Sequence, residues 1–494
     1  MEAEVLCTSW ENKFWRSSPS FSREPHINFG ILGLTLFSSF NAKSWGEKGG
    51  GFCISETEEM AGVPLASKFF TLLLRVNRQQ NYGRRMKMNY KAKYLKLVVC
   101  ISLLIFFTAF PFTAFSQTKD KIRIGTAISL SGPYAPGAGM TQIPNYNMWV
   151  EEVNAKGGLL IKKLNKRLPV ELITYDDKSD IGTAVKLVEK LILEDKVDLL
   201  LPPWGTAMHF AIAPVVTKYG YPVMGPTVSS EKLREIAHKV PYFFGILNMP
   251  REQGAALADL LEELEVKKVA LIYVADAYGI EWTGKVAPDL GLKKMDVVIL
   301  KSYPLDTKDL SPLLKTIKAA EVDAVLCMSY PNDTFLITKQ AKELGLNPKL
   351  FYLGVGVAFP VYKQMFGGPN AVEGIMGAGA WNPRVPYPGA KEYFERHVKR
   401  WKTEPDRWGS AFAYASLQIL EQAIEKVGSI DRKKIRDCIA TQTFPTVIGP
   451  VRFEGGFNVQ SPGEIGQWQK GEFEVVAAKE KRTAKPIFPK PSWP

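Results

Sequence analysis

The sequence predicts an α/β protein built from two lobes, and three observations lead to this fold class. From Lys121 onward, short apolar runs alternate with amphipathic helical segments, a rhythm typical of parallel sheets covered by helices. The same rhythm restarts after Asn248 and continues for about as many residues. The connections between the two units are short, and no long linker rich in serine, glycine or proline separates them.

The first unit has the order β-α-β-α-β. Val185, Val188, Leu191 and Ile192 share one helical face, and Gly220 supplies the end of the following helix. The expected strands are 122–128, 170–175, 197–201 and 221–224, and the expected helices are about 140–155, 183–194 and 206–219.

The second unit begins with a helix and continues with apolar strand candidates. A further helix and a β-rich stretch complete the chain, and the Lys- and Pro-rich end at 479–494 is predicted to be a frayed surface tail. The expected helices are 251–264 and 409–427, and the expected strands are 268–274, 297–303, 322–329, 350–354 and those within 447–476.

A single long uncharged segment, residues 97–115, precedes both units. Lysines come before it and small residues follow it, a pattern that predicts a secretory signal peptide over 86–116; the alternative is a transmembrane anchor. Because signal peptides begin proteins, residues 1–85 are interpreted as a non-native or disordered extension, with a genuine cytoplasmic extension as the alternative. We therefore expect a periplasmic or other extracytoplasmic location.

Several classes of protein are excluded by what the sequence lacks. The net charge of +13 is not gathered into a dense basic block, so we expect no nucleic-acid partner. Cys327 and Cys438 do not form a CxxC motif, and the four histidines are scattered, so neither a metal nor a cofactor is expected. No P-loop, GxSxG or HExxH motif occurs. Asp176 and Asp177 are neighbours on a strand that point to opposite faces, so we interpret them as structural carboxylates.

Polar side chains instead follow two strands of the first unit. Strand 197–201 ends before Trp204 and Thr206, where a helix starts, and strand 221–224 ends before Thr227 and Ser229. Ligands bind beyond the carboxyl ends of strands in open α/β sheets, and helix N-termini with hydroxyls suit a carboxylate. In the second unit, Tyr278 and Tyr330 follow strands and are candidates for pocket walls.

At this point the sequence resembles the type I periplasmic binding proteins, in particular the leucine/isoleucine/valine-binding branch. The resemblance covers about residues 119–480, and EVNAKGG together with YDDKSD is its most specific pair. The matching segments are LSGPYAPG (130–137), EVNAKGG (152–158), YDDKSD (175–180), AIAPVVTKYGYPVMGPTVSS (211–230), DAYG (276–279) and TVIGPVRFEGG (446–456).

The resemblance implies two Rossmann-like lobes joined by three hinge crossings, with ligand bound in the cleft between them. The crossings are expected near 245–249, 377–382 and 447–450. Lobe 1 is expected to comprise 119–247 and 379–447, lobe 2 to comprise 248–378 and 448–480, and 481–494 to form the tail.

The same resemblance assigns roles to individual residues. Thr206, Thr227 and Ser229 correspond to the positions that hold the ligand carboxylate in the relatives, and Tyr278 and Tyr330 to tyrosines that cover the ligand. Val355 falls where the amino-acid-binding relatives carry an acidic partner for the ligand ammonium.

A buried ammonium without a counter-ion is costly. The ligand is therefore expected to carry a carboxylate without requiring an ammonium, for example an aromatic or branched aliphatic acid. Asp276 as a substitute acid is the open alternative. The aromatic ring that closes the cleft in relatives falls at Gly137, and Tyr134 or Trp204 is the expected replacement.

These observations predict a non-enzymatic, monomeric substrate-binding subunit of an ABC importer for branched-chain amino acids or related small carboxylates. Its expected partners are membrane permease and ATPase subunits. The alternative is a ligand-sensing receptor domain with the same fold. An enzyme is disfavoured because the sequence offers no nucleophile–base set.

Overall fold

The computed structural model describes residues 119–379, 381–460 and 463–494, all of which belong to one compact unit that spans Phe112–Pro494. The expected signal peptide and the 1–85 extension lie outside the described residues. Within the described part, no helix combines the length and the apolarity needed to cross a membrane.

The first lobe is organised around two small sheets that lie next to each other, with β5 beside β6. One sheet is parallel and has the order β4-β1-β5, and the other has the order β13-β14-β15-β7-β6. The strands are β1 (Ile122–Ile128), β4 (Val170–Asp176), β5 (Leu199–Leu201), β6 (Val223–Gly225), β7 (Phe243–Gly245), β13 (Thr443–Thr446), β14 (Gly449–Glu454) and β15 (Phe457–Asn458).

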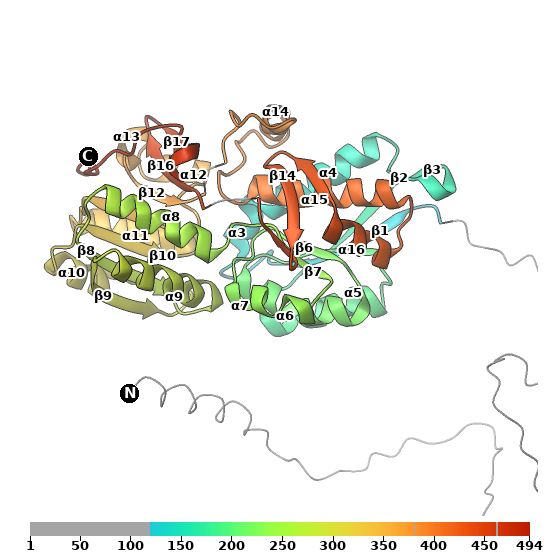
Figure 1. The fold of residues 1–494 in the computed structure, drawn as a ribbon, viewed down its shortest axis with the longest axis horizontal. Helices are drawn as coiled ribbons and strands as arrows, with labels where there is room; N and C mark the ends of the chain where they lie inside the picture. The colour runs from blue at the N-terminus through green and yellow to red at the C-terminus, as the bar shows by residue number, and fades with distance from the viewer. Residues whose placement is uncertain (1–118, 380, 461–462) are drawn as a thin grey trace, which may run out of the picture. The chain divides into compact units, whose positions relative to one another are not determined.

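Helices and one hairpin complete this lobe (Figure 1). The helices are α3 (Ala135–Met140), α4 (Gln142–Ala155), α5 (Ile181–Leu193), α6 (Thr206–Tyr219), α7 (Glu231–Glu235), α14 (Ala390–Trp401), α15 (Ser410–Val427) and α16 (Arg432–Thr441), and the short turns are η1 (Lys162–Leu164) and η2 (Ala237–Lys239). The hairpin pairs β2 (Leu159–Ile161) with β3 (Lys166–Leu168).

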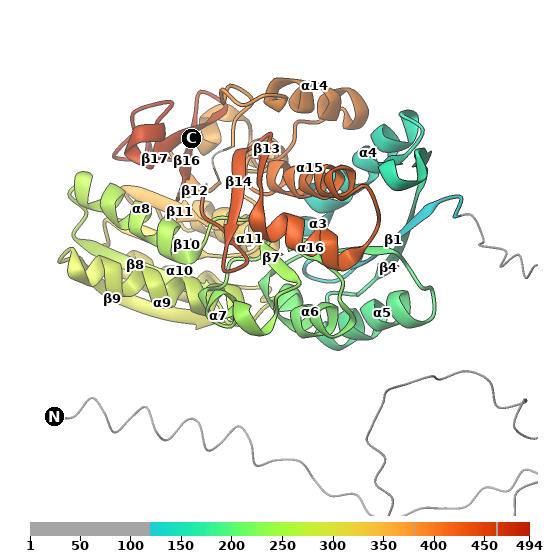
Figure 2. The same ribbon diagram turned by 45° about the vertical axis from the view of Figure 1, so that its right-hand side comes forward.

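The second lobe contains one seven-stranded sheet, with helices on both of its sides (Figure 2). Its order is β17-β16-β12-β11-β10-β8-β9, parallel from β9 to β12 and antiparallel in β16 and β17. The strands are β8 (Lys268–Val274), β9 (Asp296–Tyr303), β10 (Ala324–Met328), β11 (Leu350–Leu353), β12 (Met376–Ala378), β16 (Ile465–Gln469) and β17 (Glu472–Ala477). The helices are α8 (Pro250–Glu263), α9 (Ala277–Leu292), α10 (Ser311–Ala319), α11 (Pro331–Glu343), α12 (Pro360–Met365), α13 (Pro369–Val372) and η3 (Lys479–Lys481).

This architecture confirms the predicted α/β fold class. The core of the second lobe contains strands that are buried on both faces. In β10, for example, all five residues are buried. Strands covered on both faces are expected for a parallel sheet under two helical layers.

The third crossing between the lobes is not where the sequence suggested. We expected the chain to leave the first lobe near 447–450, but β14 pairs with β13 and β15, and Phe457 of β15 pairs with Gly245 of β7. Residues 449–458 therefore belong to a first-lobe sheet, and the chain reaches the second-lobe sheet only at β16. Buried and exposed residues alternate along β14. This pattern would be the same in a sheet of either lobe, so the sequence did not reveal which sheet β14 joins.

The expectation of a frayed tail at 479–494 is wrong. The indole N–H of Trp493 donates to the carbonyl of Leu346 at 2.8 Å, and the backbone N–H of Lys490 donates to the carbonyl of Lys349 at 2.7 Å. The ring of Trp493 also packs edge-on against Phe351 at 6.2 Å. The tail is thus ordered against the second lobe.

Candidate functional site

The loops that follow the parallel strands of the two lobes face each other, with α6 packed near α9 and α3 near α11. Three of the helices that start at this junction carry their own side-chain acceptors. Ser230 accepts from the N–H of Leu233 at the start of α7, and Asp276 accepts from the N–H of Gly279 at the start of α9, both at 3.0 Å. Asp333 accepts from the N–H of Tyr330 at the start of α11.

Helix α6 differs from these three. Its N-cap is Gly205, with φ at +91°, and no side chain accepts from the first turn. The N–H groups at the start of a helix are unpaired donors at the positive end of the helix dipole. Because the adjacent hydroxyls are buried, this helix start is suited to a carboxylate that arrives from outside the chain.

The three predicted hydroxyl residues come together at this helix start, each with only 2% of its surface exposed. The backbone N–H of Ser229 donates to the hydroxyl of Thr206 at 3.2 Å, and the hydroxyl of Ser229 donates to the carbonyl of Asn248 at 2.9 Å. Thr206 and Ser229 therefore form one cluster at the start of α6.

Thr227 has a different position in the network. Its hydroxyl donates to the side-chain oxygen of Gln142 at 2.7 Å and accepts from the N–H of Gly205 at 3.2 Å. These bonds hold the loop before α6 in place and occupy the Thr227 side chain. Any contact from Thr227 to a ligand would accordingly come from its backbone.

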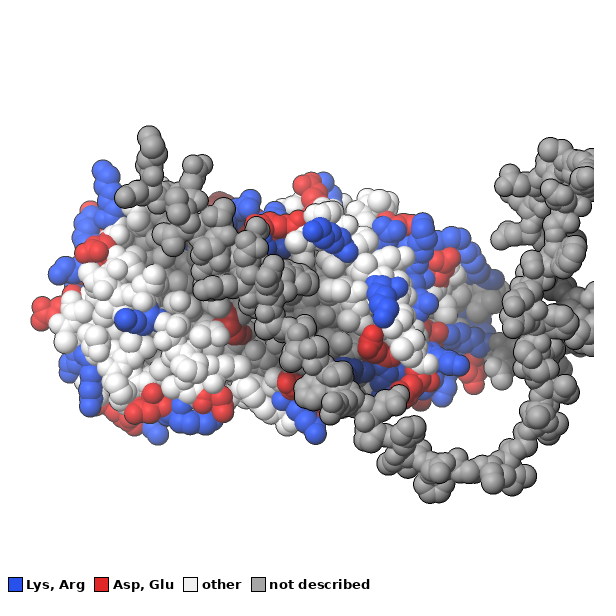
Figure 3. Space-filling model, turned by 90° about the horizontal axis from the view of Figure 1, so that it is seen from below, with Lys and Arg blue, Asp and Glu red and all other residues white. Residues whose placement is uncertain are grey.

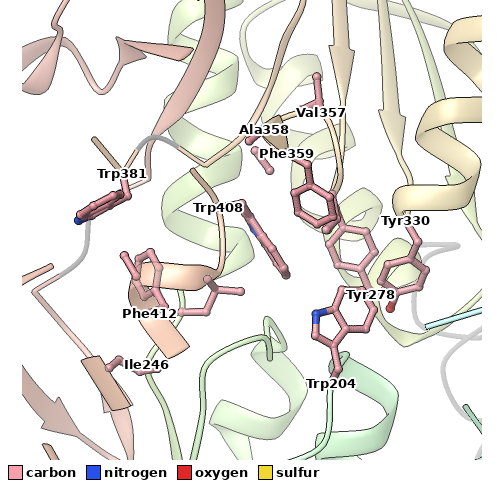
Figure 4. Packing of buried hydrophobic residues seen from close by; sticks show 14 of the residues in the cluster. Trp204, Ile246, Tyr278, Tyr330, Val357, Ala358, Phe359, Trp381, Trp408 and Phe412 are labelled. Carbon is pink, nitrogen blue, oxygen red and sulfur yellow. The ribbon is translucent and has the colours of Figure 1, made fainter. Parts of the chain in front are cut away.

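Aromatic rings from both lobes gather next to this cluster (Figure 4). Trp204 of the first lobe lies 5.4 Å from Tyr330 of the second lobe, and Tyr330 stacks on Tyr278 at 5.1 Å, all as ring-centroid distances. Trp408 lies 6.1 Å from Trp204, and Phe359 points toward the same group. Apolar and aromatic walls with few polar groups are the usual surroundings of a small-molecule ligand.

Trp204 occupies the space that a side chain at position 137 would need. A Cβ atom on Gly137 would lie 2.2 Å from a ring carbon of Trp204. The indole is held in place by its N–H, which donates to the hydroxyl of Thr141 at 3.0 Å. Trp204, one of the two replacements considered from the sequence, thus lies against position 137.

The hydroxyl of Tyr278 is a polar group that makes no hydrogen bond to the described residues. This hydroxyl is buried. Burial, together with the neighbouring Tyr352 and Asp276, raises the pKa of this hydroxyl well above its usual value, so it stays a neutral donor. A buried donor without a partner costs free energy until a ligand satisfies it.

Val355 directly follows Gly354, which adjoins this hydroxyl, and it carries no charge. Its side chain is 1% exposed, and its N–H donates to the carbonyl of Ser329 at 2.8 Å. A Cβ on the preceding residue, Gly354, would lie 2.9 Å from the hydroxyl oxygen of Tyr278. The position from which the relatives' acid would act is therefore apolar here.

Asp276, the alternative acid, is already engaged. One of its carboxylate oxygens accepts from the hydroxyl of Tyr330 at 2.7 Å and from that of Tyr134 at 3.3 Å, while the other accepts from Gly279. Burial raises the pKa of this carboxyl, against the opposing effect of these hydrogen bonds. Its two shorter contacts lie within the second lobe, and the contact with Tyr134 joins it to the first lobe.

Trp408 and the bond from Tyr134 to Asp276 are parts of this network that the sequence did not predict. The carboxylate of Asp406 accepts from the N–H groups of Trp408 and Gly409 at 2.8 and 2.6 Å. An aspartate shortly before a predicted helix is a recognised capping signal, and it marked this loop as a rigid one. The direction in which Trp408 points could not be read from that signal.

Asp176 and Asp177 have the structural role predicted for them. Asp176 accepts from the N–H groups of Leu130 and Ser131, and Asp177 accepts from the hydroxyl of Ser129 at 2.6 Å. In the part of the chain that the structure describes, no group of three or more histidine, cysteine or acidic side chains is placed to hold a metal ion.

The sequence profile of the periplasmic binding protein family matches residues 121–472, and the chain belongs to this family. Among curated proteins it is 24% identical over 377 residues to Leu/Ile/Val-binding protein homolog 7 of Brucella suis biovar 1 (strain 1330), covering 73% of this chain and 92% of that protein.

Two solved structures illustrate the shared fold. One is the branched-chain amino acid transporter substrate-binding protein LivJ from Streptococcus pneumoniae in complex with isoleucine, with a TM-score of 0.62 and 22% identity over 72% of this chain and 99% of that one. The other is a solute-binding protein of an ABC transporter from Rhodopseudomonas palustris BisB5 in complex with 3,4-dihydroxy benzoic acid, with a TM-score of 0.62 and 18% identity over 76% and 98%. The fold is therefore that of the type I periplasmic binding proteins.

Proposed function

We propose that this protein is the extracytoplasmic substrate-binding subunit of an ABC importer, and that its ligand is a small carboxylic acid without an α-ammonium, preferably an aromatic one. The lobes would close over the ligand by a hinge motion and present it to a membrane permease driven by an ATPase. Family membership supports the first part of this proposal. The chemistry of the site supports the second.

One observation carries the choice of ligand. The uncapped start of α6, with the hydroxyl of Thr206 held beside it by Ser229, offers donors to a carboxylate, whereas Val355 leaves an ammonium without a partner. Asp276 is bonded to two tyrosines and Gly279, so an ammonium would have to compete for it. An ammonium buried without compensation loses several kcal/mol of hydration (about 3–5 kcal/mol when a buried pair is broken).

The aromatic walls favour a flat apolar body on the acid. Trp204, Trp408, Tyr278 and Tyr330 present ring faces and edges, and the free hydroxyl of Tyr278 can donate to a polar substituent. Aromatic pairs add about 0.5–1.5 kcal/mol each beyond the area they bury. Among the relatives, the protein from Rhodopseudomonas palustris BisB5 was solved with 3,4-dihydroxy benzoic acid, which has this chemistry.

Thermal-shift measurements test the proposal. Benzoate, 3,4-dihydroxybenzoate and 4-methylpentanoate are compared with leucine and phenylalanine, all at the same concentration. A ligand present at a hundredfold excess over its Kd stabilises the folded state by about 2.7 kcal/mol. We expect the ammonium-free acids to raise the melting temperature and the amino acids to leave it nearly unchanged; the reverse order would reject the ligand class.

Substitution at position 355 tests whether the missing negative charge is the reason that an amino acid is disfavoured as the ligand. Val355→Glu places an acid at the position that the resemblance assigns to the relatives' acidic residue, and Val355→Gln is the neutral control of the same shape. We expect leucine to stabilise Val355→Glu more than it stabilises Val355→Gln or the wild type. Equal responses of the two variants would show that the missing charge does not decide the ligand.

A further inference from the structure

The hairpin of β2 and β3 carries a concentration of exposed positive charge. Its turn and second strand present four exposed cations, and none of them forms an ion pair with a described residue. These four residues are Lys162, Lys163, Lys166 and Arg167. Between them in the sequence lies Leu164, which is 55% exposed, so the turn presents an apolar side chain together with the positive charges.

The hairpin presents this tip from a rigid base. Leu159, Ile161 and Leu168 are each no more than 2% exposed and pack into the first-lobe core. The backbone N–H of Lys163 donates to the carbonyl of Gly428, at the end of α15, at 2.9 Å. Asn165 turns the chain with φ at +47°. The charged tip is therefore held in one orientation.

The base of the hairpin lies beside the start of β1. The N–H of Ile122 donates to the carbonyl of Pro169 at 2.8 Å, directly after β3. Figure 1 shows β1, β2 and β3 at the same end of the first lobe, and in Figure 3 lysine and arginine side chains gather at that end.

The sequence before this point contains the uncharged apolar segment 97–115, which three residues separate from Lys119. The base of the hairpin therefore lies beside the first described strand, which follows that apolar segment in the sequence.

We propose that the tip of the β2–β3 hairpin binds an anionic lipid surface. The four cations pair with lipid phosphates, and Leu164 inserts among the headgroups. Each lysine or arginine near an anionic leaflet strengthens binding by about fivefold. The tip lies at the amino ends of the strands, whereas the ligand site lies at their carboxyl ends, so the two sites are independent.

Vesicle flotation tests this surface with protein that begins at Gln117, which retains all described residues and their core. The vesicles contain phosphatidylcholine alone or phosphatidylcholine with phosphatidylglycerol. We expect binding to the mixed vesicles only, and we expect it to weaken steeply with added salt because exposed charges are screened. Equal binding to both vesicle types, or to neither, would overturn the proposal.

Charge reversal locates the contact. The hairpin variant changes Lys162, Lys163, Lys166 and Arg167 to Glu; the control changes Lys267, Lys294, Lys301 and Lys315, four exposed second-lobe lysines, to Glu and has the same net charge. We expect binding to fall at least about a hundredfold in the hairpin variant and much less in the control. Equal losses of vesicle binding in the two variants would show that only net charge matters, and would reject the hairpin as the binding site.

A second variant keeps the test independent of charge. Leu164→Ser removes the exposed apolar side chain and leaves all cations in place. We expect about a tenfold loss of vesicle binding from the lost insertion and an unchanged melting temperature. Unaltered binding would show that Leu164 does not enter the lipid and would contradict this part of the proposal. Circular dichroism melting confirms folding of every variant.

Discussion

The hydroxyl of Tyr134 lies 3.3 Å from the carboxylate of Asp276, although 142 residues separate the two along the chain and they belong to different lobes. The same carboxylate oxygen accepts from Tyr330 at 2.7 Å. A second bridge lies one turn further along α9, where Glu281 accepts from the backbone N–H of Lys232 in α7 at 3.0 Å and from the hydroxyl of Ser230. Helix α9 thus contacts the first lobe through two carboxylates, with Tyr278 between them.

Asp276→Asn is expected to favour the open arrangement of the lobes. The amide accepts the two tyrosine hydroxyls less strongly than a carboxylate, because hydrogen bonds to charged groups are the stronger ones. We expect ligand affinity to fall about tenfold and the radius of gyration of the ligand-free protein, measured by small-angle X-ray scattering, to rise. Asp296→Asn, on the exposed start of β9, is the matched control. An unchanged radius and affinity in Asp276→Asn would contradict a role in closure.

Replacing both Thr206 and Ser229 with alanine is expected to weaken ligand binding without unfolding the protein. Loss of the Thr206 hydrogen bond to a charged ligand costs about 2 kcal/mol, and loss of the Ser229 bond to Asn248, which positions this loop, adds about 1 kcal/mol. Together these losses correspond to about a hundredfold in Kd. Isothermal titration calorimetry with the best acid from the screen measures this loss. Thr316→Ala, on an exposed turn of α10, is the control. Full affinity in the double variant would show that the carboxylate does not bind at the start of α6.

Gly137→Ala tests the steric exchange between position 137 and Trp204. The added Cβ would meet the indole ring at 2.2 Å, so we expect a loss of about 2–3 kcal/mol in the free energy of unfolding. Gly139→Ala, in the same helix, meets nothing within 4 Å and should be neutral or slightly stabilising. In a double-mutant cycle with Trp204→Ala, the double variant should lose less unfolding free energy than the sum of the losses in the two single variants. Strict additivity would mean that the two positions do not interact.

Asp333 is expected to make stability depend on pH in the acid range. Burial, with a smaller contribution from the Asp276 charge, raises the pKa of this carboxyl to about 6. A raised pKa means that the folded state binds the proton more tightly than the unfolded state. The Asp333 contribution to stability is therefore greatest below pH 4 and is lost as the pH rises toward 6.

The loss amounts to at most about 3 kcal/mol for a shift of about two units. Asp333→Asn lacks this titration, so the difference in unfolding free energy between the wild type and the variant should shift in favour of the variant between pH 4 and pH 6. Denaturant unfolding at several pH values measures it. A difference that stays constant with pH would refute the assignment.

Much of the architecture was accessible from local patterns. The bounds of β1, β8 and α6 match the expected ranges because continuous apolar runs and a closing Gly220 mark them. The third crossing and the tail were wrong because both depend on distant partners. Phe457 pairs with Gly245, and Trp493 packs on Phe351, and no local pattern encodes either contact.

The candidate site also has parts that the sequence predicts and parts that depend on distant contacts. Thr206, Thr227 and Ser229 follow strands that lie in neighbouring sheets, so their proximity was predictable from topology. That the Thr227 hydroxyl is bonded to Gln142 was not predictable, since the two are 85 residues apart. The engagement of Asp276 by tyrosines of both lobes likewise depends on how the lobes meet, and the sequence left its role open.

The uncapped start of α6 also has a practical consequence for work with the purified protein. A buried set of donors that lacks an internal acceptor will take whatever small anion the solvent provides. Acetate, formate or citrate in a storage buffer would then act as a competitor, and apparent affinities would vary with buffer composition. Exhaustive dialysis into a buffer without carboxylates, with chloride held constant, makes measurements from different preparations comparable.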